Sequence, residues 1–212
     1  MERERGRVLI AGSGYVGGRL AELLVEEGIP VVGLKRDPST LPQGVDPYAG
    51  DVTDPASLEA MAELDLDAVV YAVSPSDRTE AAYRAAYVDG PRNVLAVLPG
   101  GVRTILVSST GVYGQTDGRR VDEDSPPEPA SATAELILEG ESLVRERGEP
   151  GIVLRLGGIY GPGRTRNVRR VLAGEARCPG PDRYGNRIHR DDAARAARHL
   201  LTVVRPWHRR QV

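Results

Sequence analysis

A glycine-rich turn near the start of the chain constrains the possible fold more than any other feature. Gly12, Gly14 and Gly17 stand in the spacing G-x-G-x-x-G within VLIAGSGYVGGRLAELL. The turn follows an apolar, β-branched run at residues 8–11 and opens a helix expected over 16–27, and this context gives the pattern its meaning. The spacing predicts a strand–turn–helix unit whose backbone can approach a phosphate closely.

The chemistry of this turn indicates a dinucleotide site. The first glycine permits the tight turn, the second leaves room for a pyrophosphate, and the third lets the helix pack close to the strand. The free N–H groups and the positive dipole end of the helix favour the bound anion. We expect a nicotinamide dinucleotide here, against the alternative of a glycine turn with no ligand. The residues expected to contact it are Gly12, Gly14, Tyr15, Val16 and Gly17.

Apolar runs and helical patterns alternate along the rest of the chain. Asp77 is expected to cap a long helix, with Gly90-Pro91 as its kink. Nearly continuous apolar strands between helices predict a parallel sheet covered on both faces. The fold class is therefore α/β, a doubly wound Rossmann sheet in a single domain over residues 1–212. Further strands are expected at 30–34, 68–73, 103–107 and 152–156, and further helices at 54–63, 77–98, 131–148 and 191–204.

The composition excludes several other classes of function. The formal net charge is −2, so we expect neither nucleic acid nor a membrane surface as a partner. No segment approaches the roughly eighteen apolar residues of a membrane span, and no signal peptide is expected. A single cysteine, Cys178, fits a reducing compartment, so a cytoplasmic location is expected. The sequence contains neither metal-ligand spacing nor a Ser-His-Asp arrangement.

Two segments are expected to hold the adenosine end of the cofactor. The second strand ends in GLKRDP, where an acid would favour NAD and basic residues suit the 2′-phosphate of NADP. Because Lys35 and Arg36 precede Asp37, NADP is favoured over NAD, and solvated surface charges are the alternative. In GDVTDP, Asp51 is expected to accept a hydrogen bond from the adenine amino group, beside Val52, although the segment also has the pattern of a helix cap.

Further motifs occur in an order that resembles a known superfamily. After the glycine turn and GDVTDP come VSSTGVYG (107–114), LRLGGIYGPG (154–163) and IHRDDAARAA (188–197). Together they resemble an atypical branch of the extended short-chain dehydrogenase/reductase superfamily, also called the NAD-dependent epimerase/dehydratase family. The resemblance implies an oxidoreductase, epimerase or dehydratase acting on a small molecule such as a sugar nucleotide or similar polyol. It also implies a homodimer formed through the helices expected at 77–98 and 131–148.

The resemblance implies roles for individual residues on the substrate side. Ser109 in VSSTGVYG matches the family's catalytic serine, which bonds the substrate carbonyl or hydroxyl oxygen, and local capping is the alternative. Ser108, Gly157 and Ile159 are expected to contact the cofactor near its nicotinamide. Tyr113 is a candidate substitute acid, with structural packing as the alternative.

The family's catalytic Tyr-x-x-x-Lys pair has no counterpart in the corresponding stretch, PPEPASATAELILEGE (126–141). The lysine of that pair lowers the pKa of the tyrosine, which is otherwise about 10 for a phenol. Depending on the register, Thr133 and Ile137 or Ser131 and Glu135 stand at these two positions. Extended members also carry a C-terminal substrate-binding part, which we expect to be reduced in this chain.

Two functions of different classes are left open. The first is an enzyme of atypical mechanism that moves a hydride between NAD(P) and a hydroxyl or carbonyl carbon, with Ser109 polarising the oxygen. A water or a nonstandard tyrosine would then replace the missing acid. The second is a non-catalytic dinucleotide-binding sensor or regulatory protein. The missing Tyr-x-x-x-Lys pair favours the second, and the retained serine and nicotinamide-side motifs favour the first.

Overall fold

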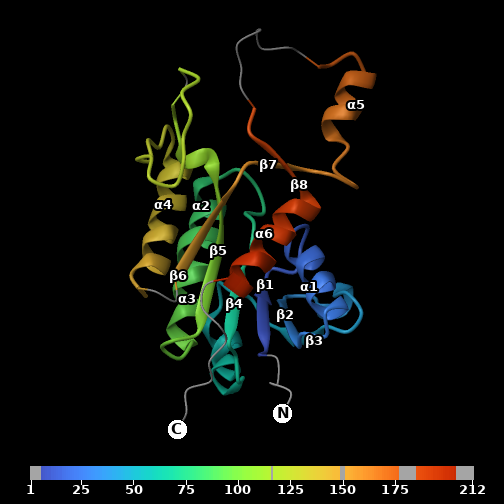
Figure 1. Cartoon of the computed structure of the whole chain (residues 1–212), viewed down its shortest axis with the longest axis vertical. Coiled ribbons are helices and arrows are strands. Elements are labelled where there is room, and N and C mark those ends of the chain that lie inside the picture. Colours follow the sequence, from blue (N-terminus) through green and yellow to red (C-terminus); the bar gives the residue numbers. More distant parts are fainter. Residues whose placement is uncertain (1–5, 116, 149–150, 177–184, 204–212) are drawn as a thin grey trace.

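A six-stranded sheet forms the central layer of the protein (Figure 1). The structure is a computed structural model and describes residues 6–115, 117–148, 151–176 and 185–203. The strand order is β3-β2-β1-β4-β5-β6, and every neighbouring pair is parallel. This arrangement confirms the predicted doubly wound Rossmann sheet. The strands are β1 (Val8–Ala11), β2 (Val31–Lys35), β3 (Asp46–Ala49), β4 (Ala68–Tyr71), β5 (Arg103–Ser109) and β6 (Gly151–Leu156).

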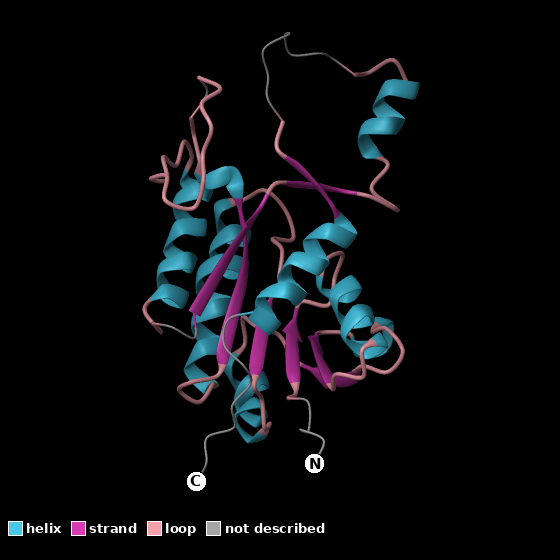
Figure 2. Ribbon diagram, viewed as in Figure 1, coloured by secondary structure: helices cyan, strands magenta, loops and turns pink. Residues whose placement is uncertain are grey.

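Helices cover both faces of this sheet (Figure 2). One face carries α1 (Gly17–Glu26) and α6 (Arg190–Val203), which pack against each other. The other face carries the 3₁₀ helix η2 (Pro55–Glu63), α3 (Gly90–Val97) and α4 (Ala132–Arg145). A shorter helix, α2 (Glu80–Arg84), leads into α3 through the π-helical turn η3 (Ala85–Asp89).

The strands are buried on both faces, which explains their continuous apolar sequences. In β1, Val8 and Ile10 pack toward α1 and α6, whereas Leu9 and Ala11 pack toward the opposite helical layer. All four side chains are fully buried. Because the sequence contains no phenylalanine, aliphatic side chains make up most of both core layers.

The strand order changes direction between β1 and β4. The chain passes from β1 outward to β2 and β3, and it then crosses to β4 on the other side of β1. The loops that leave the carboxyl ends of β1 and β4 therefore diverge and leave a crevice, which is where doubly wound sheets bind ligands. The predicted glycine turn is the loop that follows β1.

A smaller unit lies beyond the carboxyl edge of the central sheet. Its strands β7 (Gly158–Tyr160) and β8 (Arg187–His189) pair in parallel. Between them, α5 (Arg166–Leu172) stands away from the central sheet (Figure 1). Its side chains are correspondingly exposed, with Leu172 at 82%.

Three local predictions differ from the structure. The strand β3 was not predicted, because it is an exposed edge strand with a proline and without an apolar run. The cap of α2 is Thr79, which accepts the Ala82 N–H, while Asp77 accepts hydrogen bonds from Thr79. The π-helical turn η3 directly precedes Gly90, where the kink was expected. Gly90 has no Cβ, which leaves room for the Tyr71 hydroxyl.

Candidate functional site

A cleft of about 680 Å³ opens at the carboxyl ends of β1, β2 and β4. The segment that follows β4, residues 72–76, forms part of its wall, and Arg164 contributes from the loop before α5. Predicted cofactor contacts that line this cleft are Gly12, Gly14, Tyr15, Lys35, Arg36, Asp51 and Val52. The structure thus brings predicted contacts from three separate segments, at the ends of β1, β2 and β3, to the expected switch point.

The glycine turn is shaped so that its backbone faces the cleft. Gly12 has a φ of +90°, and a Cβ there would lie 2.7 Å from the Val73 nitrogen. A Cβ on Gly17 would overlap the Gly12 carbonyl oxygen, so α1 packs directly on the turn. By contrast, no atom lies within 4 Å of a Cβ built on Gly14, which lines the cleft. The turn therefore leaves free space at the position where a pyrophosphate is expected.

The start of α1 has the properties of an anion site. No side chain caps this helix, and its first turn contains no acidic residue. The N–H groups of Tyr15 and Val16 have no backbone acceptor among the described residues. The hydroxyl of Ser13 is buried and also lacks a hydrogen-bond partner in the part of the chain that the structure describes. These unsatisfied groups fit a dinucleotide pyrophosphate.

Basic side chains gather where β2 ends. Lys35 donates a hydrogen bond to the Thr40 hydroxyl, and the Arg36 guanidinium lies 3.9 Å from the Asp51 carboxylate. Arg36 is 79% exposed, so it can turn toward a ligand at little cost. The carboxylate of Asp37 is engaged by Ser39, whose hydroxyl and backbone N–H both donate to it and hold its pKa below the ordinary value.

Asp51 and Val52 follow the end of β3. The Asp51 carboxylate accepts hydrogen bonds from the backbone N–H and the hydroxyl of Thr53 at 2.9 and 2.8 Å. The backbone N–H contributes most to holding the Asp51 pKa below its ordinary value, so this group is an ionised acceptor on the cleft wall. Val52 is buried, and its carbonyl oxygen accepts a hydrogen bond from Asn93 at 2.9 Å.

The remaining predicted contacts do not line the cleft. Val16 and Gly17 are buried at the start of α1, where they support the turn. Gly157 packs closely on Asn186, and Ile159 belongs to a small apolar cluster beneath β7 and β8. Ser108 is 4% exposed, and its hydroxyl donates to Glu141 at 2.6 Å.

Ser109 is oriented by its own loop. Its hydroxyl oxygen accepts the Gly111 N–H at 3.0 Å and thereby caps the turn η4 (Thr110–Val112). No described residue accepts the Ser109 hydroxyl proton in a hydrogen bond, so this proton is free to be donated. Ser109 is half-buried at the end of β5, beside the fully engaged Ser108.

A buried ion pair that was not predicted from the sequence lies beside β5 and joins α4 to β6. Glu141 on α4 is 1% exposed, and Arg155 on β6 donates to it through Nε and Nη2, with Nη2 at 2.6 Å from the carboxylate. These bonds raise the pKa of Arg155 further above its ordinary value. The signal in the sequence was a single acid on the apolar stripe of a helix and a single arginine in an apolar strand.

Tyr113 is bound into the same network. Arg155 donates through Nη1 to the Tyr113 hydroxyl at 2.6 Å, and its guanidinium carbon lies 4.9 Å from the centre of the ring. The Tyr113 hydroxyl in turn donates to the Asp122 carbonyl at 2.8 Å. Its proton is therefore committed to the backbone in this structure.

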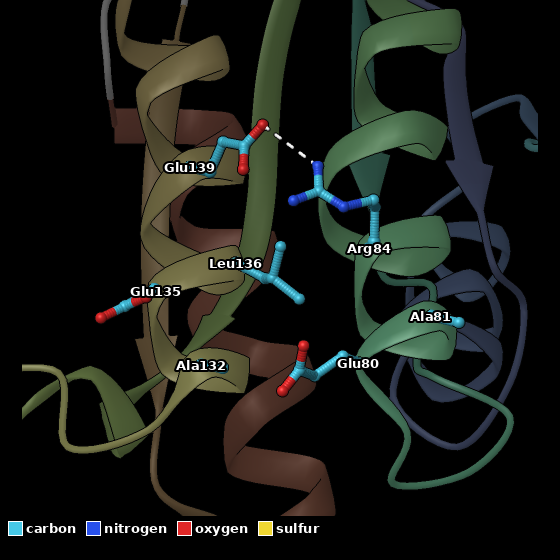
Figure 3. A pocket seen from close by; sticks show the side chains of 7 residues that line it. All are labelled: Glu80, Ala81, Arg84, Ala132, Glu135, Leu136 and Glu139. Carbon is cyan, nitrogen blue, oxygen red and sulfur yellow. Dashed lines mark ion pairs between the residues drawn. The ribbon is translucent and has the colours of Figure 1, made fainter.

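The helix α4 contains neither tyrosine nor lysine. Ser131 caps it by accepting the Ala134 N–H, and Ile137 is buried. Glu135 instead lines a groove of about 290 Å³ between α2 and α4 (Figure 3). In that groove Arg84 pairs with Glu139 at 3.5 Å, and no predicted cofactor contact takes part. Pairing of two chains through these helices stays a prediction.

The fold and the cleft together define a dinucleotide-binding protein of the Rossmann type. The chain belongs to the NAD dependent epimerase/dehydratase family, whose model matches residues 8–205. This membership confirms the resemblance of the motifs to the epimerase/dehydratase family. Within the described residues, no helix is both long and apolar enough to cross a bilayer.

Three similar proteins illustrate the range of the family. A 3-diazoavenalumate denitrifying reductase from a Streptomyces species is 33% identical over 90% of this chain and 70% of its own. The structure of a putative NAD-dependent epimerase/dehydratase from Methylobacillus flagellatus is 37% identical, with a TM-score of 0.78 over 95% of this chain and 73% of that one. MoeE5, solved in complex with UDP-glucose and NAD, is 27% identical, with a TM-score of 0.74 over 93% and 72% of the two chains.

Proposed function

We propose that this protein binds a nicotinamide dinucleotide in the cleft and moves a hydride between it and a hydroxyl or carbonyl carbon of a small substrate. The observation that carries the proposal is the glycine turn, where free N–H groups and the open space beside Gly14 face the same cleft. When bound, the nicotinamide ring supplies or accepts the hydride. A sugar nucleotide or similar polyol is the proposed substrate class, and the complex of MoeE5 with UDP-glucose and NAD supports it.

Ser109 is the proposed contact to the substrate oxygen. Its oxygen accepts the Gly111 N–H, and no described residue accepts its proton in a hydrogen bond, so the hydroxyl is available to donate to a substrate oxygen. A hydrogen bond to a developing alkoxide strengthens as the hydride arrives, which stabilises the transition state. Because the Tyr113 proton is committed to Asp122, we assign the proton that completes carbonyl reduction to water. Hydride and proton together convert a carbonyl to an alcohol.

NADP is the proposed preference over NAD. Lys35 and Arg36 line the adenosine end of the cleft, and the only acid directly beside them in the sequence, Asp37, is engaged by Ser39. A 2′-phosphate would meet two cations there, and basic residues at this position suit that group.

A second candidate function is dinucleotide binding without turnover, as a sensor or regulatory protein. The observation that favours it is α4, which offers neither a phenol nor an amine to the substrate. Both candidates bind the same cofactor. They differ only in whether the bound nicotinamide changes its oxidation state in a reaction. Turnover therefore discriminates them directly.

The test is calorimetric titration of the chain with NADPH and then with NADH, followed by incubation with carbonyl substrates that include 4-keto sugar nucleotides. We expect saturable binding, tighter for NADPH, and loss of the reduced nicotinamide absorbance with at least one substrate class. Binding without turnover across the substrates would support the sensor. Absence of binding by both dinucleotides would overturn both candidates.

A further inference from the structure

Arg164 reaches the dinucleotide cleft from the loop between β7 and α5. Its guanidinium carbon lies 4.1 Å from the centre of the Tyr15 ring, and the residue lines the same cleft as Gly12 and Gly14. Nη1 of Arg164 donates to the Ile159 carbonyl at 3.1 Å, which fixes the direction of the side chain. A cation is therefore held beside the residue that directly follows Gly14.

Tyr15 joins this loop to the glycine turn. Its hydroxyl donates to the Pro162 carbonyl at 2.9 Å, although the two residues are 147 positions apart in the sequence. The Arg190 guanidinium also lies near the ring, 5.3 Å from its centre. Stacking on an aromatic face orients a guanidinium while leaving its N–H edge available. Tyr15 thus positions Arg164 relative to the start of α1.

The two arginines differ in their charge balance. Arg190 lies 3.4 Å from the Asp191 carboxylate, which itself pairs with Arg19. Arg164 has no carboxylate within 4.0 Å in the described part of the chain. A guanidinium stays protonated at neutral pH, so Arg164 adds an uncompensated positive charge to the cleft. The N-terminus of α1 adds a second positive potential at the glycine turn.

We propose that Arg164 binds the dinucleotide pyrophosphate from the opposite side to the N-terminus of α1. The planar guanidinium matches two phosphate oxygens, and the ring of Tyr15, the residue after Gly14, holds it beside the turn. The pyrophosphate would then be held between backbone N–H groups and one arginine that is distant in the sequence. The proposal rests on the proposed function, because both place the dinucleotide in the same cleft.

The test compares ADP with adenosine as probes of the whole chain by calorimetry. ADP carries two phosphates, whereas adenosine carries none, so only ADP reports the contact. In Arg164→Ala, ADP binding is expected to weaken roughly tenfold to hundredfold, as for loss of a charge-assisted hydrogen bond. Adenosine binding should not change. The affinity for ADP should also become less sensitive to salt, because one screened charge pair is lost.

Arg166→Ala is the matched control, since Arg166 is an exposed arginine two positions along that does not line the cleft. It should bind ADP and adenosine as the wild type does. Equal weakening of ADP and adenosine in Arg164→Ala would mean a change in cleft shape and would overturn the proposal. Unchanged ADP binding would overturn it as well, while wild-type binding of NADPH would leave the proposed function standing. Failure of the wild type to bind either NADPH or ADP would overturn the proposed function and the proposal together.

Discussion

The cleft at β1, β2 and β4 and the network around β5 and β6 differ in how far the protein satisfies its own polar groups. At the glycine turn, the backbone N–H groups of Tyr15 and Val16 have no backbone acceptor among the described residues, and the space beside Gly14 is open. Around β5 and β6, the hydroxyl of Ser108, the carboxylate of Glu141 and the guanidinium of Arg155 bond one another. Polar groups that line a cleft and lack internal partners are available to a ligand, whereas groups that satisfy each other hold the fold.

The same contrast separates two neighbouring serines. Ser108 and Ser109 are consecutive, but they point to different sides of β5 because side chains alternate along a strand. Ser108 donates into the buried network, and Ser109 keeps a free proton near the end of the strand. The family motif predicted a cofactor contact for Ser108, whereas the structure places its hydroxyl on Glu141. Substitutions can test whether each group serves ligand binding in the cleft or stability in the buried network.

The largest expected effect is on stability, in Glu141→Gln. The substitution leaves the Arg155 guanidinium buried without its carboxylate, and breaking a buried ion pair costs about 3–5 kcal/mol. Denaturant unfolding followed by circular dichroism should show this loss in the free energy of unfolding. Dinucleotide affinity of the folded fraction should be unchanged, because the pair lies outside the cleft.

Glu139→Gln on the same helix is the matched control. Glu139 is 42% exposed and pairs with Arg84 and Arg92 at 3.5 Å on the surface. Exposed pairs contribute only about 0–1 kcal/mol, so this variant should be nearly as stable as the wild type. If Glu141→Gln lost no more stability than Glu139→Gln, the buried network would not be a main support of the fold.

Gly14→Val should abolish dinucleotide binding without unfolding the protein. A Cβ at Gly14 meets no neighbouring protein atom within 4 Å, so a side chain there would extend into the space expected for the pyrophosphate. We expect affinity for NADPH and NADH to fall more than about a hundredfold, or roughly 2.7 kcal/mol. Calorimetric titration measures the affinity, and thermal unfolding without ligand checks that the fold is retained.

Gly17→Ala provides the opposite control on the same turn. Its Cβ would overlap the Gly12 carbonyl oxygen, so α1 would have to shift. Overpacking of this kind costs about 1–3 kcal/mol, and the unliganded protein itself should be destabilised. If Gly14→Val bound NADPH and NADH as tightly as the wild type, the glycine turn would not be part of the dinucleotide site.

Ser109→Ala should lower turnover roughly a hundredfold, because one hydrogen-bond donor to the substrate oxygen is lost. Single-turnover reduction of a carbonyl substrate measures the effect, and NADPH affinity should not change. Ser108→Ala should instead lower stability by about 1–3 kcal/mol, since Glu141 loses a buried donor. Loss of stability in Ser109→Ala, or loss of turnover without loss of stability in Ser108→Ala, would contradict these two assignments.

Much of the fold could be predicted because its signals are local. The glycine turn, the buried strands and the cap of α4 at Ser131 depend on short segments whose chemistry is readable in order. The edge strand β3 escaped prediction because its Asp-Pro-Tyr-Ala sequence has neither an apolar run nor alternation. It forms because its backbone can pair with β2, a tertiary effect that overrides local propensity.

The site could be predicted from the sequence only where the backbone of a single short segment forms it. Residues of the glycine turn line the cleft as expected, whereas the contact between Tyr15 and Arg164 joins two loops from opposite ends of the chain. The pairing of Glu141 with Arg155 likewise depends on the packing of α4 against β6. Spacing along the sequence can mark a lone acid or arginine in an apolar element, but it does not identify the partner, because the two residues meet only through tertiary packing.

The smallest expected effect concerns the choice of cofactor, in Arg36→Ala. Arg36 is largely exposed and lies 3.9 Å from Asp51, so its contact with a 2′-phosphate would be partly screened by solvent. We expect NADPH affinity to fall about tenfold, or roughly 1.4 kcal/mol, and NADH affinity to change much less. Arg84→Ala, which removes an arginine outside the cleft, should leave both affinities unchanged. Parallel titrations at low and physiological salt would show the difference between cofactors shrinking as salt rises. An equal loss for NADPH and NADH would assign Arg36 to the adenine or the cleft wall, and the cleft would then have no arginine selective for the 2′-phosphate at the end of β2.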